Sequence, residues 1–389
     1  MEKFDIAIIG AGPAGLAAVE EIRREAPQDA TILLIEKNTS YQGNIRCGEG
    51  VWKNTFDKCY TPRSTWIRNE IRQARFFSPN GSNVVFRRGG APLGYILNRA
   101  VMQEDILQEQ KSDPRVTLIR GRSVVDIIPE EETRQAIYLT DKTYYARAVI
   151  DASGPLSSLG TRFGFTQKSS CLDVAAYALV ENVNNNTEEV QLHRHRTSAH
   201  HGYLWSFPVS SGVENVGVAW GNIHQKPCNI KKILQETLPH MYPHGTPGPI
   251  YGGVIPVYTN KRAWVAPGYF QCGDTAEMVN ALTKSGIFEA MITGAIAGKY
   301  ALLYATAPSN KKRRRSGALF QKHILRRHGR RMQKGYKARL GLYGISDADM
   351  NNAISILQDR KNESISMKDI IKTVVSTHPR VYLSLRHFL

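Results

Sequence analysis

Three glycines and one glutamate near the start of the chain have the types and spacing needed to bind a dinucleotide. Residues 5–15 combine an apolar run with the pattern G-x-G-x-x-G, and Glu36 ends the next apolar run. Gly10 would permit a tight turn, Gly12 would let the backbone approach a pyrophosphate, and Gly15 would let strand and helix pack closely. The N-terminus of the following helix would face the phosphates, and Glu36 would accept hydrogen bonds from a ribose. These residues alone do not distinguish NAD from FAD.

A second segment far along the chain favours FAD. Cys272-Gly-Asp-Thr-Ala follows an apolar strand, and Gly286 opens a long apolar helix. Asp274 is placed to hydrogen-bond a ribityl or pyrophosphate linker. Backbone N–H groups at Gly286 would point at the flavin edge where negative charge accumulates on reduction. An enzyme that binds only NAD has no use for this second element.

Three aromatic residues alternate in the second half of the chain. Tyr203, Trp205 and Phe207 are separated by single residues, so in a strand their side chains share one face. They can form an apolar wall for a ligand. The alternative is that they are simply the core of their domain.

The elements that must position these residues follow from periodicity. We expect strands over 116–119 and 123–128, a hairpin over 133–139 and 144–150, and period-two strands over 175–183, 188–196, 203–209 and 215–220. The fold class is therefore α/β, a Rossmann-type FAD-binding domain with an inserted antiparallel-sheet domain and a helical C-terminal extension. The expected bounds are 1–171 with 255–305 for the FAD domain, 172–254 for the substrate domain and 306–389 for the extension.

The excess positive charge lies at the C-terminal end. Of a net charge of +17, residues 310–389 hold 19 Lys/Arg against 5 Asp/Glu. Apolar residues at helical spacing, such as Leu319 and Ile324, interrupt this basic segment. It suits an anionic membrane surface, where each basic group contributes about 1 kcal/mol. A solvated helix face is the plain alternative, and nucleic acid is the rival partner that we do not expect.

Cysteine content and hydropathy indicate where in the cell the protein is located. The five cysteines are scattered without a C-x-x-C pair, which argues against a disulfide framework and fits a reducing compartment. The apolar start forms the nucleotide turn itself, so it is not a secretory signal. No apolar run reaches the length of a membrane-spanning helix. We expect a cytoplasmic protein, peripheral to the membrane.

Several motifs in the same order resemble the geranylgeranyl reductases, within the wider group that includes p-hydroxybenzoate hydroxylase. The resemblance spans nearly the whole chain. It rests on the glycine motif together with Arg46-Cys-Gly-Glu-Gly50, Gly94-Tyr-Ile-Leu-Asn-Arg99, Val149-Ile-Asp-Ala-Ser-Gly154, Gly202-Tyr-Leu-Trp-Ser-Phe-Pro208 and Gly273-Asp-Thr-Ala276 through Ile287. It implies an FAD enzyme that saturates double bonds of isoprenoid chains.

The resemblance also implies residue roles. Arg99 would lie near the FAD phosphates, Ser123 and Val124 near the adenine, and Arg46 to Glu49 against the flavin ring. The complete expected FAD set is Gly10, Gly12, Pro13, Ala14, Gly15, Glu36, Lys37, Arg46, Cys47, Arg99, Ser123, Val124, Gly154, Gly273, Asp274, Lys284, Ser285, Gly286 and Ile287. The candidate catalytic residues are Cys47, Arg46 and Glu49, and the expected prenyl-chain contacts are Tyr203, Trp205, Phe207 and Pro208. Beside Arg46 and a flavin, Cys47 would have a lowered pKa and act as proton donor or positioning group; the alternative is a plain small hydrophobe.

The chain departs from the family pattern at two places. Where the family reads Pro-Leu-Thr-Gly-Gly-Gly-Ile, this chain reads Ala281-Leu-Thr-Lys-Ser-Gly-Ile287, so Lys284 and Ser285 replace two glycines. We hypothesise that the Lys284 ammonium raises the reduction potential of the flavin. Ala199-His-His201 stands where a proline usually precedes the aromatic motif.

Four histidines, His193, His195, His200 and His201, cluster in the sequence. A metal site would need a further convergent ligand that the sequence lacks, so we expect no metal.

These observations predict an FAD-dependent reductase of isoprenoid double bonds that acts on a membrane lipid or another prenylated precursor. The electron donor is either NAD(P)H or ferredoxin, and the sequence leaves the oligomeric state open. The enzymatic alternative is an FAD monooxygenase or halogenase of a small aromatic or natural-product substrate, because one fold serves both chemistries. The non-enzymatic alternative is a flavin- or lipid-binding protein in which Lys284 and Ser285 mark lost catalysis.

Overall fold

Continuous apolar runs build the central parallel sheet. Strand β1 (Glu2–Ile9) pairs in parallel with β2 (Ile32–Glu36) and with β11 (Thr143–Asp151). All five residues of β2 are buried, as expected for parallel strands covered on both faces. The structure is a computed structural model that describes residues 2–87, 90–131, 133–165, 172–194, 202–221, 229–259, 262–343, 345–358, 372–373 and 376.

The chain divides into two compact units. The first comprises 1–45, 100–170 and 256–333, and the second comprises 46–99, 171–255 and 334–389. Residues 46–99 therefore group with the inserted sheet, whereas we had expected them in the FAD domain. The physical reason is that β5 (Gln73–Phe77) pairs in parallel with β13 (Glu189–His193). The basic segment up to residue 333 groups with the first unit.

The first unit is a Rossmann-type arrangement. Its main sheet has the order β18-β19-β11-β1-β2-β8, with the β9–β10 pair attached to β11. Its further elements are α1 (Pro13–Glu25), α3 (Arg99–Lys111), β8 (Val116–Arg120), β9 (Val124–Glu131), β10 (Arg134–Leu139), the 3-10 turn η2 (Leu159–Phe163), β18 (Val265–Ala266), β19 (Tyr269–Gln271), the 3-10 turn η3 (Gly273–Ala276), α5 (Ile287–Ala305), α6 (Asn310–Ile324) and the π-helical turn η4 (Leu325–Gly329). The strands and the hairpin predicted between 116 and 150 are confirmed.

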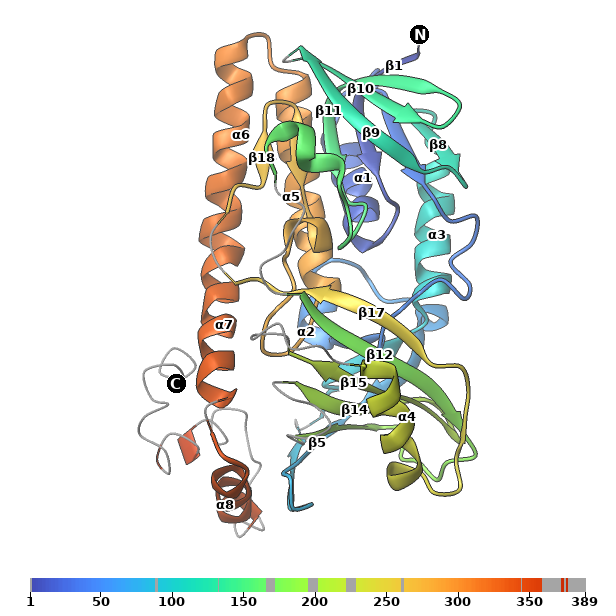
Figure 1. The fold of residues 1–389 in the computed structure, drawn as a ribbon. Coiled ribbons are helices and arrows are strands. Elements are labelled where there is room, and N and C mark those ends of the chain that lie inside the picture. The colour runs from blue at the N-terminus through green and yellow to red at the C-terminus, as the bar shows by residue number, and fades with distance from the viewer. Residues whose placement is uncertain are drawn as a thin grey trace. The chain divides into compact units, whose positions relative to one another are not determined.

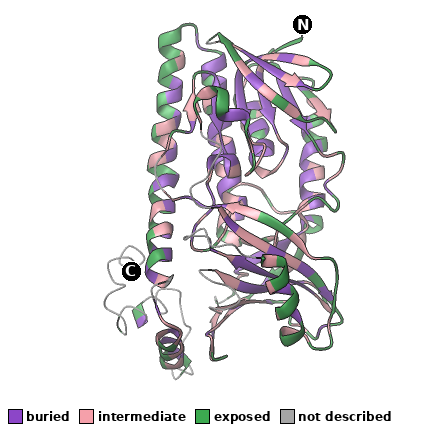
Figure 2. Cartoon of the chain, viewed as in Figure 1, coloured by how far each residue is buried: buried purple, intermediate pink, exposed green. Residues whose placement is uncertain are grey.

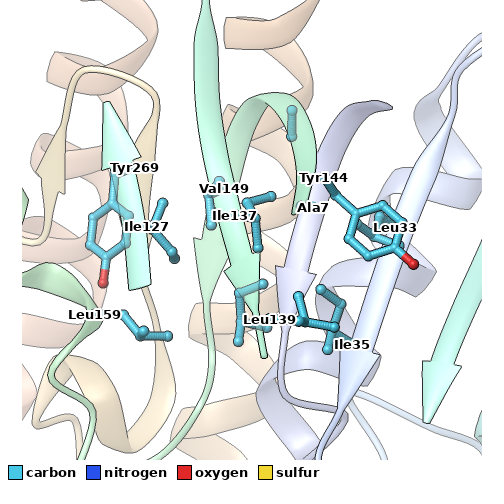
Figure 3. Packing of buried hydrophobic residues seen from close by; sticks show 12 residues of the cluster. Ala7, Leu33, Ile35, Ile127, Ile137, Leu139, Tyr144, Val149, Leu159 and Tyr269 are labelled. Carbon is cyan, nitrogen blue, oxygen red and sulfur yellow. The ribbon is translucent and has the colours of Figure 1, made fainter. Parts of the chain in front are cut away.

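One face of this sheet is covered by the β9–β10 hairpin and η2. Figure 3 shows the resulting apolar cluster, in which side chains of β1, β2 and β11 meet residues of the hairpin. Ile127 and Ile137 are fully buried there, and Tyr269 closes the cluster from β19. This packing fixes the carboxyl ends of the parallel strands, where the glycine turn begins.

The opposite face of the sheet is covered by α1 and α5, which lie side by side (Figure 1). A Cβ added at Gly294 of α5 would lie 2.0 Å from the carbonyl oxygen of Ala14, and one added at Gly298 would lie 2.6 Å from that of Ala18. The two backbones are thus in direct contact. Most residues of both helices are buried (Figure 2).

The second unit contains a mixed sheet and a small antiparallel one. The larger has the order β16-β12-β15-β14-β13-β5-β6, with β17 beside β12, and the smaller has the order β3-β7-β4. The elements are β3 (Gly50–Trp52), α2 (Lys53–Phe56), the 3-10 turn η1 (Ser64–Trp66), β4 (Ile67–Ile71), β6 (Asn83–Arg87), β7 (Gly94–Leu97), β12 (Leu172–Glu181), β14 (Tyr203–Ser210), β15 (Val213–Trp220), α4 (Ile230–Met241), β16 (Thr246–Pro247) and β17 (Tyr251–Pro256). The four predicted strands of the insertion are present in the described residues; residues 195–196 of the second lie outside them.

The core of the second unit lies between its large sheet and α4. Val216 and Val218 of β15 pack with Leu234 and Leu238 of α4, and Leu204 of β14 joins them. Alternation along the strands therefore directs the odd-numbered residues of β14 to the other face of the sheet.

The C-terminal helices are α7 (Arg330–Tyr343) and α8 (Asp347–Gln358). Arg339 of α7 forms a fully buried ion pair with Asp173 of β12 at 2.7 Å, within the second unit. The Ser346 hydroxyl caps the start of α8, where it accepts the Asp349 N–H at 3.1 Å. No described helix has both the length and the hydropathy to span a bilayer.

We predict that Gly294→Ala destabilises the protein by about 1–3 kcal/mol, because a methyl group there forces α1 and α5 apart. In an ordinary helix the same change would stabilise by up to about 1 kcal/mol. Gly317→Ala in α6 is the matched control, since its Cβ would make an ordinary contact of 3.4 Å with Val265. Urea unfolding followed by circular dichroism measures both. Equal effects of the two substitutions would contradict the close helix contact.

Candidate nucleotide site and aromatic face

The glycine turn of the first unit has the geometry that the sequence predicts. Gly10 has φ +96°, and a Cβ there would lie 2.5 Å from the Ala152 carbonyl oxygen. A Cβ at Gly15 would lie 1.8 Å from the carbonyl oxygen of Gly10. At Gly12 an added Cβ would meet no described atom within 4 Å. Two glycines are thus required by packing, and the middle one borders open space.

The start of α1 is suited to an anion. Gly12 is the N-cap and Pro13 opens the helix; among the described residues no side chain caps this end, and its first turn holds no acidic residue. The first N–H groups of a helix need external acceptors, and the helix dipole favours negative charge there. A pyrophosphate satisfies both requirements.

Glu36 holds the turn in shape. Its buried carboxylate accepts the Ala11 N–H at 2.8 Å through one oxygen and the Asn38 N–H at 2.8 Å through the other. The Asn38 side-chain N–H also donates to the second oxygen at 2.9 Å, whereas among the described residues the first oxygen accepts only the Ala11 N–H and has capacity for a further bond, such as one from a ribose. The Glu36 carbonyl accepts the Gly121 N–H at 2.8 Å, which brings the segment before β9 to the same sheet edge.

The remaining residues expected around the adenine differ in exposure. Lys37 and Ser123 are exposed, whereas Val124 is half-buried and packs against the core cluster of the sheet. Their roles toward FAD stay predictions.

The second nucleotide segment converges on the first within the same unit. Gly273 has φ +59°, and a Cβ there would lie 2.9 Å from the Cβ of Ala14 in α1. A Cβ at Gly286 would lie 3.6 Å from the Asp274 carboxylate. The η3 turn, the start of α1 and the start of α5 at Ile287 therefore form one neighbourhood, although about 260 residues separate them in sequence.

Gly154 and Thr275 join the strand end of β11 to η3. The Thr275 hydroxyl accepts the Gly154 N–H at 3.0 Å and contacts the Gly154 carbonyl at 3.1 Å. Gly154 has φ +101°, which favours glycine. Sequence reasoning missed Asp151, whose buried carboxylate accepts the hydroxyls of Ser153, Ser157 and Tyr269; its position directly before the Ala-Ser-Gly turn was the available signal.

The loop that departs from the family pattern is held by its own hydrogen bonds. The Asn280 side chain accepts the N–H groups of Leu282 and Thr283, and the Asn280 N–H donates to the Ser285 carbonyl at 3.0 Å. Lys284 has φ +57°, the left-handed region where the family places glycine. Its Nζ donates to the Ala281 carbonyl at 2.9 Å.

In the second unit the Arg46–Gly50 loop lies against the aromatic motif. A Cβ at Gly48 would lie 3.2 Å from the Phe207 ring and 3.3 Å from Nε1 of Trp205, and one at Gly50 would lie 3.1 Å from Phe207. Both glycines thus allow the loop backbone to touch the rings. The motif Arg-Cys-Gly-Glu-Gly and the aromatic motif therefore lie side by side; their roles toward flavin and substrate stay predictions.

Asn215 of β15, which the sequence analysis missed, joins these two motifs. Its Oδ1 accepts Nε1–H of Trp205 at 3.0 Å, and its Nδ2 donates to the Cys47 carbonyl at 3.1 Å. Asn215 is 2% exposed. Gly217, which pairs with Trp205 across the two strands, makes room for the indole ring, because a Cβ there would lie 2.2 Å from the ring.

The charged residues of the loop have distinct partners. The Arg46 guanidinium lies 4.2 Å from the centre of the Tyr251 ring. Glu49 has φ +60°, and its carboxylate accepts the N–H of Arg99, the first residue of α3, at 3.0 Å. Burial raises the pKa of Glu49, and the Arg99 N–H and guanidinium partly oppose that rise. The N–H of Glu49 also reaches the Cys47 sulfur at 3.2 Å.

The aromatic residues do not belong to the core under α4. Tyr203, Trp205 and Phe207 lie on the sheet face opposite Leu204, and neighbouring rings are 6.3 and 6.4 Å apart. Tyr203 and Phe207 are half-buried. By strand register Leu192 and Phe76 continue this face, because they pair laterally with Trp205 and with each other. We call this set the aromatic face.

Pro208 is an exception to the expected substrate contacts. It follows Phe207 directly, so alternation places it on the core side of β14, where it is buried. Its carbonyl accepts Nδ2 of Asn69 at 2.7 Å. Pro208 therefore does not line the aromatic face.

Of the clustered histidines, only His193 is among the described residues; His195, His200 and His201 lie outside them, as does the 199–201 departure. The His193 ring stacks on Phe77 at 4.1 Å, and burial lowers its pKa to about 4. Within the described ranges no group of three His, Cys, Asp or Glu could hold a metal ion.

Comparison with known proteins places the chain in a family. The sequence profile of the lycopene cyclase protein family matches residues 5–199. The chain belongs to this family. It is also similar to proteins named digeranylgeranylglycerophospholipid reductase: 26% identical to that of Methanoculleus marisnigri, over 98% of this chain and 97% of the relative, and 25% identical to that of Methanothrix thermoacetophila, over 100% of both.

Solved structures agree on the fold. A geranylgeranyl bacteriochlorophyll reductase-like protein from Thermoplasma acidophilum superimposes with a TM-score of 0.88 at 22% identity, with 100% of both chains covered. A flavin-dependent halogenase gives a TM-score of 0.70 at 13% identity, over 99% of this chain and 72% of the halogenase. The predicted resemblance, the α/β fold class and FAD as the cofactor type of this fold are confirmed.

We predict that Asn215→Leu lowers the free energy of unfolding by about 2–6 kcal/mol, because Trp205 Nε1 and the Cys47 carbonyl each lose a partner at about 1–3 kcal/mol. The released loop should also expose its thiol. Reaction of native protein with a thiol reagent, read at the Cys47 peptide by mass spectrometry, should be faster in the variant. Trp205→Phe removes only one of the two bonds and serves as the intermediate control. An unchanged Cys47 rate would contradict the bridging role.

Proposed function

We propose that the protein is an FAD-dependent reductase that saturates carbon–carbon double bonds of isoprenoid chains, specifically geranylgeranyl chains on a membrane glycerophospholipid. The observation that carries this proposal is the aromatic face. It lies outside the core under α4 and touches the loop with Cys47 and Glu49. Relatives named for this reduction match almost the entire chain, which supports the substrate class.

The residues of the first unit fit FAD. The uncapped start of α1 would bind the pyrophosphate, Glu36 the ribose, and Asp274 the ribityl chain, with the N-terminus of α5 next to it. FAD, when bound, supplies the electrons that reduce an alkene.

The second unit would bind the prenyl chain and exclude water. An unactivated alkene needs a proton at one carbon, delivered in a dry environment. Tyr203, Trp205 and Phe207 provide an apolar surface for the chain. Cys47 is the proposed proton donor, and Glu49, whose pKa is raised by burial, can hold a proton close by. Arg46 would position the loop through its contact with Tyr251.

A membrane-lipid substrate requires access to the bilayer. We propose that the basic segment after residue 310 brings the protein to an anionic membrane surface. The electron donor is proposed to be NAD(P)H or a small redox protein such as ferredoxin, because the chain has a single G-x-G-x-x-G pattern.

The reductase proposal predicts an anaerobic product that is two hydrogen atoms heavier for each double bond. Purified, FAD-loaded protein is incubated with dithionite and geranylgeranylated glycerophospholipid in detergent, and the product is weighed by mass spectrometry. Cys47→Ala should lower the rate by about 10²–10⁴-fold if the thiol donates the proton. Cys59→Ala, another thiol of the same unit, should leave it unchanged. Oxygen uptake with an oxygenated product would instead support a monooxygenase.

A second prediction concerns Lys284. An ammonium near a flavin favours the added electrons, so Lys284→Ala should make the flavin midpoint potential more negative. Lys284→Arg keeps the charge and should preserve the potential. Redox titration of the bound flavin measures both variants without turnover. A potential that is unchanged in Lys284→Ala would exclude this role and leave Lys284 as a loop residue bonded to Ala281.

A further inference from the structure

A groove of about 340 Å³ opens on the surface of α6 and η4 in the first unit. We call it the cationic groove, lined by Ala318, Gln321, Lys322, Leu325, Arg326 and Arg330. Ala318 and Leu325 supply apolar carbon, and the three cations stand around them. Gln321 is fixed from below, because its side chain accepts the Trp264 N–H and donates to the Arg262 carbonyl.

The π-helical turn places Arg330 in this groove. The N–H of Arg330 donates to the Leu325 carbonyl, five residues back instead of the usual four. In a regular α-helix the Leu325 carbonyl would instead accept the N–H of Gly329, four residues further on. Single π-turns inside α-helices are frequent at functional sites. Here the extra residue aligns a third cation with Lys322 and Arg326.

A buried carboxylate explains the turn. Glu289, in the first turn of α5, is 3% exposed and is paired with Arg331 and, at 3.4 Å, with His328. Both partners lie within or directly after η4. Because His328 and Arg331 face Glu289, Arg330 lies on the outer side of the helix, where it is exposed.

The groove carries uncompensated positive charge. The chain has no Asp or Glu from 306 to 346. Among the described residues Lys322, Arg326 and Arg330 form no ion pair, unlike Arg331. The pKa of His323 is lowered, first by burial and then by Arg327, His328 and Lys299, which reflects the positive potential of this surface.

We propose that the cationic groove binds the phosphate headgroup of an anionic lipid at the membrane surface, with the lipid's apolar portion against Ala318 and Leu325. This inference deepens the proposed function and rests on its membrane-lipid substrate. The apolar floor favours a lipid over a nucleic acid, whose sugar–phosphate backbone offers no matching apolar surface. A groove of this size also suits one headgroup better than a protein docking face.

The test measures binding of the full-length, FAD-loaded protein to phosphatidylcholine vesicles with and without phosphatidylglycerol. Binding should require the anionic lipid. Arg326→Ala/Arg330→Ala should weaken it by about 30-fold, since each cation contributes about 1 kcal/mol. Ala318→Glu, which adds an anion at an exposed position, should also weaken it. The matched control is Lys311→Ala/Lys312→Ala, which removes the same charge from the first turn of α6, outside the groove, and should cost much less.

Three outcomes would overturn the inference. Equal losses of vesicle binding in the groove and control variants would mean that the attraction is diffuse. Absence of vesicle binding by the wild-type protein would exclude the lipid as the ligand. Tighter binding to duplex DNA that is lost in the groove variants would assign a nucleic acid as the ligand. Rates on detergent-dispersed substrate separate this test from the proposed function, because the groove variants should retain the wild-type rate there. Wild-type protein that binds vesicles but reduces no lipid would overturn the function alone.

Discussion

Direct backbone contact between α1 and α5 is the constraint on which the nucleotide site depends. Gly294 and Gly298 allow α5 to approach the carbonyls of Ala14 and Ala18, and Gly273 sits against the same turn of α1. Side chains at positions 294 and 298 would clash with these carbonyls and force the helices apart. The start of α5 would then lie away from the glycine turn, and two segments from opposite ends of the sequence could not hold one dinucleotide. Gly294 and Gly298 thus act through their small size, which allows the two helices to touch.

In the second unit, one sheet provides both a core face and the aromatic face. The even-numbered residues of β14 pack under α4, so the core there does not include Tyr203, Trp205 and Phe207. The odd-numbered residues lie on the opposite face, where we propose that a chain-shaped ligand binds. A buried asparagine, Asn215, then ties the Cys47 loop to Trp205. A buried amide left without partners costs more free energy than its hydrogen bonds contribute. The Cys47 loop is therefore held in a fixed position against the aromatic face.

The sequence predicts local features well and partners across strands poorly. Apolar runs and glycine spacing predict β1, α1 and β2, since both depend on residues close together in the chain. The period of two predicts that Tyr203, Trp205 and Phe207 share a face, but not which face meets the core; that depends on α4. The same alternation excludes Pro208, which motif matching had included. Residues 46–99 group with the inserted sheet through the β5–β13 pairing, a non-local contact without a sequence signal. Asn215 was missed for the same reason.

The buried charge of Glu289 links two surfaces of the first unit. A carboxylate in the first turn of α5 is favoured by the helix dipole, but its burial requires cationic partners. Arg331 is a cationic partner, and the His328 ring lies 3.4 Å from the second carboxylate oxygen. Both residues approach Glu289 from the same side of the helix, which a π-turn between α6 and α7 permits. The same turn orients Arg330 outward. The element that opens toward the nucleotide site therefore also determines the charge pattern of the cationic groove, so a substitution at Glu289 would disturb both.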